Sequence, residues 1–376
     1  MENTKIEFLY LNEEDMVKAG VMDMNGCIET MDEMFSLLYE GDYLMGGANN
    51  NSHGMGIYFP KESKVAGMPL HAPDKRFMAM PAYLGGRFHL TGVKWYGSNK
   101  ENGKKGLPRS ILTVMLNNVE TGAPLALLSA NLVSAMRTGA VPGVAAKYLA
   151  RQEATSVCLI GPGVVNRTAL MAYMQVRPHI DTVFLKGRGV AAIEAMKAFI
   201  AERFPQIQSV QVCDTVEQAV KQADIVSVAA SASTDYPYIK GSWLKEGSVV
   251  LGPGLLTIDR EFLVEKAKKV ADNWAMYEVA AEERGNAYPI HNSLGLVGTC
   301  FLDHIHDGFM KREDILELGG IASGKQPGRR NNSEIFVVSI NGMAVEDVAW
   351  GYVVYQKALK AGIGKKLKLW DAPQMK

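Results

Sequence analysis

A buried strand that runs directly into a glycine turn constrains this 376-residue chain more than any other feature. Val157–Ile160 is an unbroken apolar run, typical of a strand covered on both faces. Gly161 and Gly163 follow one residue apart, so the backbone can turn sharply and approach a ligand closely. Apolar residues at helical spacing come next, and the start of a helix offers free N–H groups to a pyrophosphate. The dinucleotide fingerprint has a third glycine where this chain has Asn166, so an ordinary strand-to-helix turn remains an alternative for the motif alone.

The end of the next strand bears on the choice of cofactor. Dinucleotide folds that select NAD carry an acid there, roughly 20 residues after the glycines, to bind the ribose 2′-hydroxyl. In this chain the predicted strand Thr182–Leu185 is followed by Lys186 and Arg188, with no carboxylate at the strand end. Two cations favour an additional 2′-phosphate, so the sequence predicts NADP(H) and leaves NAD(H) as the second choice. A solvated basic turn is the alternative interpretation.

Strands and helices alternate from the glycine turn onward, which predicts a doubly wound parallel sheet with helices on both faces. The expected strands are 157–160, 182–185, 209–212, 225–229, 248–251 and 269–271, and the expected helices are 164–176, 190–203, 215–222 and 259–267. The fourth strand ends in the small residues Ala229, Ala230 and Ser231, against which a cofactor can lie. We therefore predict a cofactor site made of Gly161, Pro162, Gly163, Val164, Val165, Asn166, Lys186, Arg188, Ala229 and Ala230.

Before the glycine turn, short strands at 77–80, 88–95, 111–117 and 125–128 predict an antiparallel sheet. Lys94 lies in one of these strands, so its ammonium either faces a pocket, pairs with an acid or extends to solvent at an edge. A helix is expected from about 134 to 150 with Ser134 as its N-cap, and Pro142 should kink or restart it. Arg137 lies in the first turn of that helix among small and apolar residues, so it needs a buried partner or an anionic ligand.

The composition excludes several function classes. Lys and Arg together number 40, as do Asp and Glu, so no net charge attracts nucleic acid or an anionic membrane. The sequence contains neither an apolar run long enough to cross a membrane nor a signal-peptide pattern, so we expect a cytoplasmic protein. The four cysteines are scattered and indicate reduced core residues. His304 and His306 do not have the spacing of two metal ligands on one helix face, so we expect no metal site.

The order and spacing of several segments resemble the ornithine cyclodeaminase/mu-crystallin family over nearly the whole chain. The strongest match is Val133–Ala140 followed by Ala145–Arg151 and the glycine turn. Supporting matches are Met80–Ala82, Gly92–Lys94, Thr121–Leu125, Gly241–Gly247 and Asp259–Glu261. The resemblance implies a homodimer in which an α+β substrate and dimerisation domain is built from both chain ends. We expect this domain to comprise residues 1–132 and 326–376, and the Rossmann-type domain to comprise residues 133–325.

The resemblance also suggests roles for individual residues. Arg137 and Lys94 are similar to the family's ligands for the substrate carboxylate, with Met80 beside them, and Thr138 is similar to a dinucleotide contact. The chain departs from the family in two places: the Asn49–Gly54 loop lacks the family's arginine, and the cyclodeaminase aspartate after the fifth strand is absent from Leu251–Leu256.

Three functions follow from this combination. We predict an NAD(P)-dependent oxidoreductase acting on the C–N bond of an amino or imino acid, with Lys94 and Arg137 as its catalytic residues. The alternatives are a cyclodeaminase that releases ammonia and a non-enzymatic binder of NADP(H) or a small ligand, as in mu-crystallin-like proteins.

Overall fold

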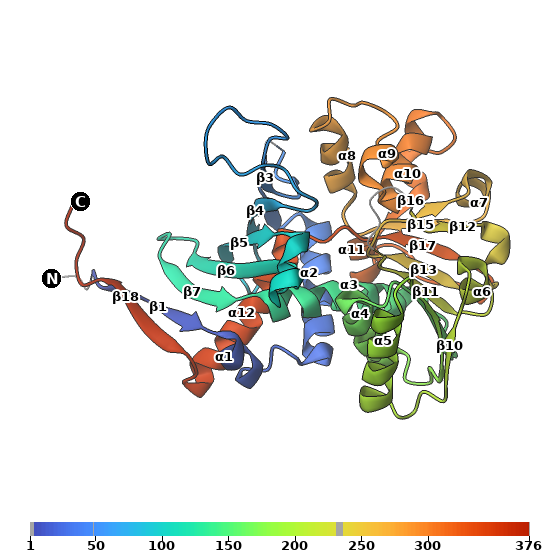
Figure 1. Cartoon of the computed structure of the whole chain (residues 1–376), viewed down its shortest axis with the longest axis horizontal. Coiled ribbons are helices and arrows are strands. Elements are labelled where there is room, and N and C mark those ends of the chain that lie inside the picture. The colour runs from blue at the N-terminus through green and yellow to red at the C-terminus, as the bar shows by residue number, and fades with distance from the viewer. Residues whose placement is uncertain (1–3, 48, 231–235, 376) are drawn as a thin grey trace. The chain divides into compact units, whose positions relative to one another are not determined.

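The computed structural model describes residues 4–47, 49–230 and 236–375, which form two compact units. The first comprises Met1–Asp23, Gly41–Arg137 and Met343–Lys376, and we call it the antiparallel unit. The second comprises Met24–Glu40 and Thr138–Gly342, and we call it the parallel unit. Figure 1 labels the helices and strands of both units and colours them by residue number. Ser231, predicted to lie near the cofactor, is outside the described residues.

The antiparallel unit is built on an eight-stranded sheet with the order β18-β1-β7-β6-β5-β4-β2, in which β3 pairs with β4. The predicted antiparallel pairing of β4 to β7 is confirmed, whereas β1 and β7 run parallel. The strands are β1 Ile6–Leu11, β2 Tyr43–Met45, β3 Met55–Tyr58, β4 Arg76–Leu84, β5 Leu90–Ser98, β6 Ser110–Asn118, β7 Pro124–Ser129 and β18 Lys365–Trp370.

Helix α12 (Ala344–Ala361) packs on one face of this sheet, against β4, β5 and β6 (Figure 1). Alternate residues of β4 and β5 are buried, because side chains along a strand point to opposite faces. Met80 and Lys94 are direct cross-strand partners and belong to this buried set. The short helices α1 (Glu13–Lys18) and η1 (Lys100–Lys105) complete the unit.

The parallel unit contains a second eight-stranded sheet, with the order β10-β9-β8-β11-β13-β17-β15-β16. Every pairing in it is parallel. From β8 the chain first moves outward to β9 and β10, then returns to the other side of β8 as β11 and β13. Because crossovers are right-handed, this reversal places helices on both faces and opens a crevice where the direction changes. The predicted doubly wound fold is confirmed, and its strands are β8 Ser156–Ile160, β9 Thr182–Lys186, β10 Ser209–Val212, β11 Ile225–Val228, β13 Val249–Gly252, β15 Lys268–Ala271, β16 Ile315–Glu317 and β17 Phe336–Ser339.

The helices of the parallel unit include those that the sequence predicts and several shorter ones. Helices α4 (Val164–Val176) and α5 (Val190–Arg203) have the expected bounds. The others are α2 Met24–Glu40, α6 Val216–Val220, α7 Arg260–Glu265, α8 Trp274–Glu282, α9 His291–Leu294, α10 Val297–His306 and α11 Leu318–Ala322. The single turns η2 Gly241–Trp243 and η3 Arg312–Asp314 and the strand pair β12 Tyr238–Ile239 and β14 Thr257–Ile258 complete the unit. None of the helices in the described part of the chain is long and apolar enough to cross a membrane.

The expected domain limits differ from the compact units in three places, the first being residues 133–137, which belong to the antiparallel unit. Strand β17 falls in the domain predicted from the two chain ends, but it lies between β13 and β15 in the parallel sheet. Its four residues are all buried, as a strand covered on both faces requires. Helix α2 packs against α4 and α11 and therefore also belongs to the parallel unit.

Helix α3 (Asn131–Leu149) also differs from the expectation. It begins three residues before Ser134, so Ser134 is inside the helix and not its N-cap. The Asn131 side chain bonds the backbone of β6, accepting from the Leu112 N–H and donating to the Ser110 carbonyl. Pro142 does not restart the helix, which is continuous through it.

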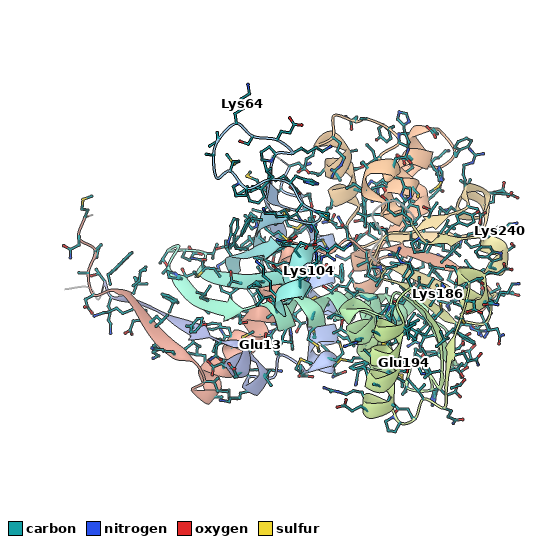
Figure 2. All side chains as sticks on the ribbon, viewed as in Figure 1. Glu13, Lys64, Lys104, Lys186, Glu194 and Lys240 are labelled. Atoms are coloured by element: carbon teal, nitrogen blue, oxygen red, sulfur yellow. The ribbon has the colours of Figure 1, made fainter. Side chains whose placement is uncertain are left out.

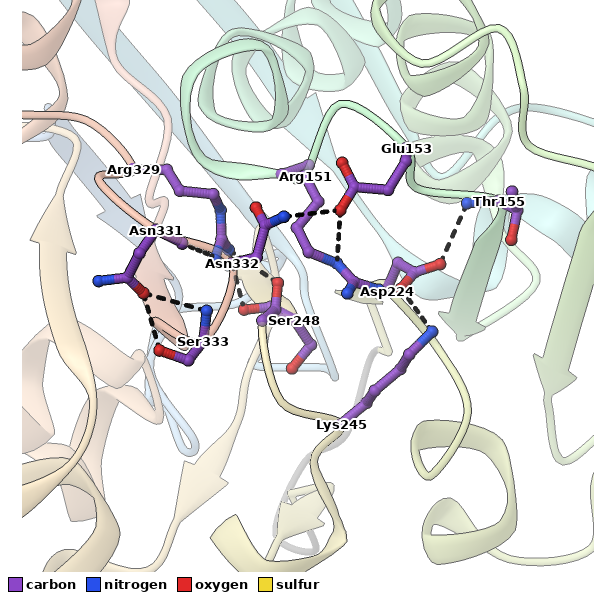
Figure 3. A network of polar contacts seen from close by, with 12 residues as sticks. Arg151, Glu153, Thr155, Asp224, Lys245, Ser248, Arg329, Asn331, Asn332 and Ser333 are labelled. Atoms are coloured by element: carbon purple, nitrogen blue, oxygen red, sulfur yellow. Dashed lines mark hydrogen bonds and ion pairs between the residues drawn. The ribbon is translucent and has the colours of Figure 1, made fainter.

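A buried carboxylate ties the amino ends of two parallel strands together (Figure 3). Asp224, immediately before β11, accepts hydrogen bonds from Arg151 and from Lys245 Nζ at 2.7 Å. Its other oxygen accepts from the backbone N–H groups of Thr155 and Ser156 at the start of β8. Burial opposes the charge, but these donors outweigh it and lower the pKa of Asp224 to about 2. This network lies at the end of the strands opposite the glycine turn.

Candidate functional site

The glycine turn borders a cavity of about 560 Å³ at the carboxyl ends of β8, β9 and β11. An open parallel sheet binds ligands at such a crevice, where the strand order reverses. Most of the predicted cofactor residues line it, namely Gly161, Pro162, Gly163, Lys186, Arg188, Ala229 and Ala230. The structure therefore brings together residues from three different strand ends.

Gly161 has a backbone conformation and surroundings that only glycine tolerates. Its φ is +95°, and a Cβ atom there would lie 2.8 Å from both the Ala229 carbonyl oxygen and the Ala230 nitrogen. Among the described residues, none beyond its chain neighbours has a heavy atom within 4 Å of the Cβ position of Gly163, the N-cap of α4. A free helix N-terminus beside open space suits a pyrophosphate, so these residues fit a dinucleotide.

The side chain of Asn166, a predicted cofactor ligand, supports this turn from inside. It is fully buried, and its amide donates to the carbonyl oxygens of Ile160 at 3.0 Å and Gly161 at 2.8 Å. Its oxygen accepts from Ser227 Oγ, which in turn accepts from the Tyr173 hydroxyl. Where the fingerprint has a third glycine, this chain therefore has a side chain that stabilises the turn.

Three other predicted cofactor residues, Thr138, Val164 and Val165, are not among the residues that line the cavity. The sequence analysis instead missed an aromatic wall. Tyr236, Tyr238 and Trp243 also line the cavity, with the Tyr238 and Trp243 rings edge to face at 6.0 Å. Flat apolar walls suit a nucleotide base. Three aromatic residues in eight positions are the signal that could have indicated this wall.

The cations predicted to bind substrate meet in a buried cluster of the antiparallel unit. Lys94 Nζ on β5 donates to Asp347 Oδ2 at 3.0 Å, and Arg137 Nη2 on α3 lies 3.1 Å from the same oxygen. Arg137 Nη1 also donates to Glu346 Oε2. Both acids lie in the first turn of α12, and Ser134 Oγ accepts from Lys94 and Arg137. The structure thus brings Lys94 and Arg137 to one carboxylate oxygen, and Met80 is the cross-strand neighbour of Lys94.

Burial and neighbouring charges shift the protonation of this cluster. Burial and the adjacent guanidinium of Arg137 lower the pKa of Lys94 to about 8, although Asp347 opposes the shift. Burial raises the pKa of Asp347, but the charges of Arg137 and Lys94 outweigh this effect and lower it overall. The two carboxylates likewise outweigh burial at Arg137 and raise its pKa. The cluster therefore pairs two cations with two buried carboxyl groups, and of the two cations Lys94 loses its proton more easily.

Glu346 and Asp347 are the site residues that the sequence analysis missed. Two adjacent acids in the first turn of a helix are usually exposed and favourable to the helix dipole. Here both are fully buried. The available signal was their position in a run that is otherwise apolar, from Met343 to Trp350.

The Asn49–Gly54 loop contains no arginine, but another arginine, Arg76, lies near Lys94 on the neighbouring strand. Arg76 begins β4 and lies on the same face of the strand as Met80, four residues away. Its guanidinium is 6.0 Å from the Tyr96 ring centroid, and Lys94 Nζ is 5.5 Å from the same centroid. Arg76 and Arg109 share one carboxylate, Asp74, so this group carries a net positive charge.

His304 and His306, considered as metal ligands, are both engaged in ring contacts. His306 stacks on Tyr288 at 3.9 Å, and His304 lies edge to face with Phe309. Within the described residues, no group of three His, Cys, Asp or Glu side chains is arranged to hold a metal ion.

The architecture of the parallel unit is that of the Rossmann-type dinucleotide-binding proteins. The chain belongs to the ornithine cyclodeaminase/mu-crystallin family, whose model matches residues 20–362. The resemblance seen in the sequence is therefore confirmed.

Relatives with named activities cover nearly the whole chain. It is 28% identical over 365 residues to the N-((2S)-2-amino-2-carboxyethyl)-L-glutamate dehydrogenase of Staphylococcus aureus, covering 97% of this chain and 99% of the relative. The solved structure of Thermococcus litoralis Delta(1)-pyrroline-2-carboxylate reductase in complex with NADH and L-proline is 28% identical, with a TM-score of 0.75 and coverage of 95% and 99%. An archaeal alanine dehydrogenase dimer with bound NAD is 26% identical, with a TM-score of 0.75 and coverage of 97% and 100%. The predicted class, an NAD(P)-dependent oxidoreductase acting on C–N bonds of amino or imino acids, is confirmed by these relatives.

Proposed function

We propose that the enzyme holds the α-carboxylate of its amino or imino acid between Arg137 and Lys94. The observation that carries this proposal is the set of donors that the buried cluster leaves unused. Among the described residues, Arg137 Nε is buried without a hydrogen-bond acceptor, and the bonds of Lys94 to Asp347 and Ser134 use two of its three N–H groups. Two cationic donors in one cluster match the two oxygens of a carboxylate.

Hydride transfer makes limited demands on the side chains. A bound nicotinamide dinucleotide would accept the hydride from the carbon of the amine or donate it to that of the imine. Arg137 and Lys94 fix the neighbouring carboxylate and thereby orient the reacting carbon. In the reductive direction Lys94 is placed to keep a proton close to the substrate nitrogen, and its pKa of about 8 permits release of that proton near neutral pH.

We propose further that the substrate carries a second carboxylate. Arg76 offers this group a second cationic position on the same strand face, with Tyr96 between it and Lys94. The name of the S. aureus relative describes an N-substituted glutamate, a secondary amine with several carboxylates. Arg76→Ala should therefore lower kcat/KM for imines of dicarboxylic acids at least about tenfold and leave those of monocarboxylic acids nearly unchanged. An equal loss for both classes would contradict the role of Arg76.

We propose that NADP(H) binds more tightly than NAD(H). Lys186, labelled in Figure 2, and Arg188 line the cavity beside Gly187, and no Asp or Glu is among the described residues lining it. The Lys186 ammonium donates to the Asp214 carbonyl oxygen at 2.7 Å. Each charge-assisted bond to a 2′-phosphate contributes about 1.5–3 kcal/mol. Fluorescence titration of both cofactors tests this: the preference should disappear in Arg188→Ala, and equal or tighter NAD(H) binding by the unmodified enzyme would refute it.

We propose oxidoreduction in preference to cyclodeamination. Ring closure with loss of ammonia needs an acid or base after the fifth strand, and this chain has Gly252-Pro253-Gly254 there. A Cβ atom at Gly254 would lie 2.9 Å from the Val228 carbonyl oxygen, so this turn cannot accept an aspartate without moving the backbone. A panel of cyclic and linear imino acids with NADPH, beside L-ornithine with NADP⁺, tests the proposal. Proline and ammonia formed without net cofactor change would favour the lyase, and cofactor binding without any turnover would favour a binding protein.

We propose a homodimer formed through the open face of the antiparallel sheet. The face opposite α12 exposes Phe77, Trp95 and Ile111 by 39%, 42% and 53%, and the first two rings stack at 5.8 Å. Contiguous apolar residues on three neighbouring strands are unusual on a monomer surface. The archaeal alanine dehydrogenase is a dimer. Sedimentation velocity should show a dimer that Trp95→Lys weakens, and a monomeric unmodified chain at micromolar concentration would contradict the proposal.

A further inference from the structure

We propose that Asp347 binds the substrate nitrogen through its Oδ1 atom, so that the buried cluster recognises a whole α-amino carboxylate. This inference rests on the proposed function and adds a ligand for the nitrogen to those for the carboxylate. Asp347 is fully buried, and its two oxygens have different surroundings. Oδ2 lies 3.0 Å from Lys94 Nζ and 3.1 Å from Arg137 Nη2.

The other oxygen of Asp347 is an unused acceptor. Among the described residues, Oδ1 is buried and has no hydrogen-bond partner. A buried carboxylate oxygen without a donor loses the hydration it would have in water, which makes binding of a donor at this position favourable. The same cluster leaves Arg137 Nε without an acceptor. Unused donors and an unused acceptor therefore lie within one buried cluster.

This inventory matches the charge pattern of an amino acid. The carboxylate of a substrate takes the free N–H groups of Arg137 and Lys94, and its ammonium or iminium N–H donates to Asp347 Oδ1. The cluster of Lys94, Arg137, Glu346 and Asp347 has no net charge in its ionised form, so a zwitterion leaves the site neutral. A simple carboxylate would instead add one uncompensated negative charge in a buried site.

The same contact assists the reaction. When hydride leaves the carbon of a neutral secondary amine, the nitrogen becomes a positively charged iminium with no proton transferred. A carboxylate fixed beside that nitrogen stabilises the charge as it develops. In the reverse direction the protonated imine accepts hydride at carbon and becomes the neutral amine. Asp347 therefore acts as a direct substrate ligand, and Lys94 and Arg137 hold its second oxygen in place.

Asp347→Asn is the informative substitution because Lys94 and Arg137 determine how the new side-chain amide is oriented. Lys94 and Arg137 both donate toward Oδ2, so the amide oxygen takes that position and the NH₂ group replaces Oδ1. A donor then faces the substrate N–H. Glu346→Gln is the matched control, because it removes one negative charge from the same helix turn, at a residue that pairs with Arg137.

The test compares ligands that differ only at nitrogen, by calorimetry on the enzyme saturated with dinucleotide. L-Proline is paired with (S)-tetrahydrofuran-2-carboxylate, and L-glutamate with glutarate. The unmodified enzyme should prefer the nitrogen-containing member of at least one pair about tenfold or more, which corresponds to about 1.4 kcal/mol. Asp347→Asn should bring that ratio close to one, whereas Glu346→Gln should weaken both members and keep the ratio.

A second comparison uses the unmodified enzyme alone and stays decisive if Asp347→Asn fails to fold. L-Proline betaine keeps the positive nitrogen but has no N–H, so it should bind at least about tenfold more weakly than L-proline. Equal binding of these two, an unchanged ratio in Asp347→Asn, or no preference for nitrogen in the unmodified enzyme would overturn the proposal. These measurements report binding and do not require turnover. If the protein shows the Asp347-dependent ratio but catalyses no reaction, the proposed activity is wrong and the role of Asp347 in binding stands.

Discussion

Replacing Asp224 by asparagine should destabilise the parallel unit, and the size of the effect follows from the network in Figure 3. The pKa of this carboxyl falls from its ordinary 3.8 to about 2 because Lys245, Ser156 and Arg151 bond the ionised form. A pKa difference of one corresponds to about 1.36 kcal/mol, so ionised Asp224 stabilises the native state by about 2 kcal/mol at neutral pH. Asparagine also leaves the Arg151 guanidinium, which is largely buried, without its carboxylate.

The stabilisation has a defined pH dependence. A carboxyl whose pKa is lowered by folding contributes its full stability above its unfolded pKa of about 4, and this contribution is lost as the pH falls through about 2. We therefore expect Asp224→Asn to lower the free energy of unfolding by about 2–3 kcal/mol at pH 7 and the melting temperature by about 5–10 °C. The difference from the unmodified protein should shrink below pH 4.

Urea unfolding followed by circular dichroism at pH 7 and at pH 3 measures this difference. The control is Glu194→Gln, which breaks a surface pair with Lys197 on α5 and should cost less than about 1 kcal/mol. Glu194 is labelled in Figure 2. Dinucleotide affinity should remain unchanged in both variants, because Asp224 lies at the other end of the strands. A loss below about 1 kcal/mol at pH 7, or a loss that persists undiminished at pH 3, would refute the reasoning.

Three further predictions concern the site. Gly161→Ala should weaken dinucleotide binding at least about tenfold, because the added Cβ would collide with the backbone at Ala229. The control Gly103→Ala lies in open space and should not change the affinity. Equal affinities of the two variants in a fluorescence titration would contradict this prediction. Imine reduction that needs the Lys94 ammonium should slow as the pH rises through about 8. The Lys94→Arg variant keeps its charge over this range, so its pH–rate profile should lack this decrease. The same decrease in the variant would show that another group titrates. Arg137→Lys should lower kcat/KM at least about tenfold with little change in dinucleotide affinity, since an ammonium cannot replace a planar guanidinium; loss of cofactor binding or of folding would show that Arg137 is structural.

Patterns local to the chain predicted most of the parallel unit. The apolar runs and helical spacing from Val157 onward placed β8, α4, β9 and α5 within one residue of their observed bounds. Such elements are predictable because burial on both faces imposes a continuous apolar run on each strand. Domain limits were less predictable, because a buried strand near the C-terminus such as β17 is equally compatible with either sheet. Only its pairing with β13 and β15 decides between them.

The sequence by itself determined the residue types of the candidate site: glycines where a side chain would collide, and cations within otherwise apolar segments. It identified Arg137 as a cation that requires a buried partner or an anionic ligand, because an unpaired buried charge is too costly, and it left Lys94 with a pocket, an acid or solvent as alternatives. Only the tertiary structure decided that the partners are Glu346 and Asp347, more than 200 residues away along the chain. Contacts of that range leave no periodic signal in the sequence. They depend on how α12 packs against β4 to β6, which burial and sheet order fix together.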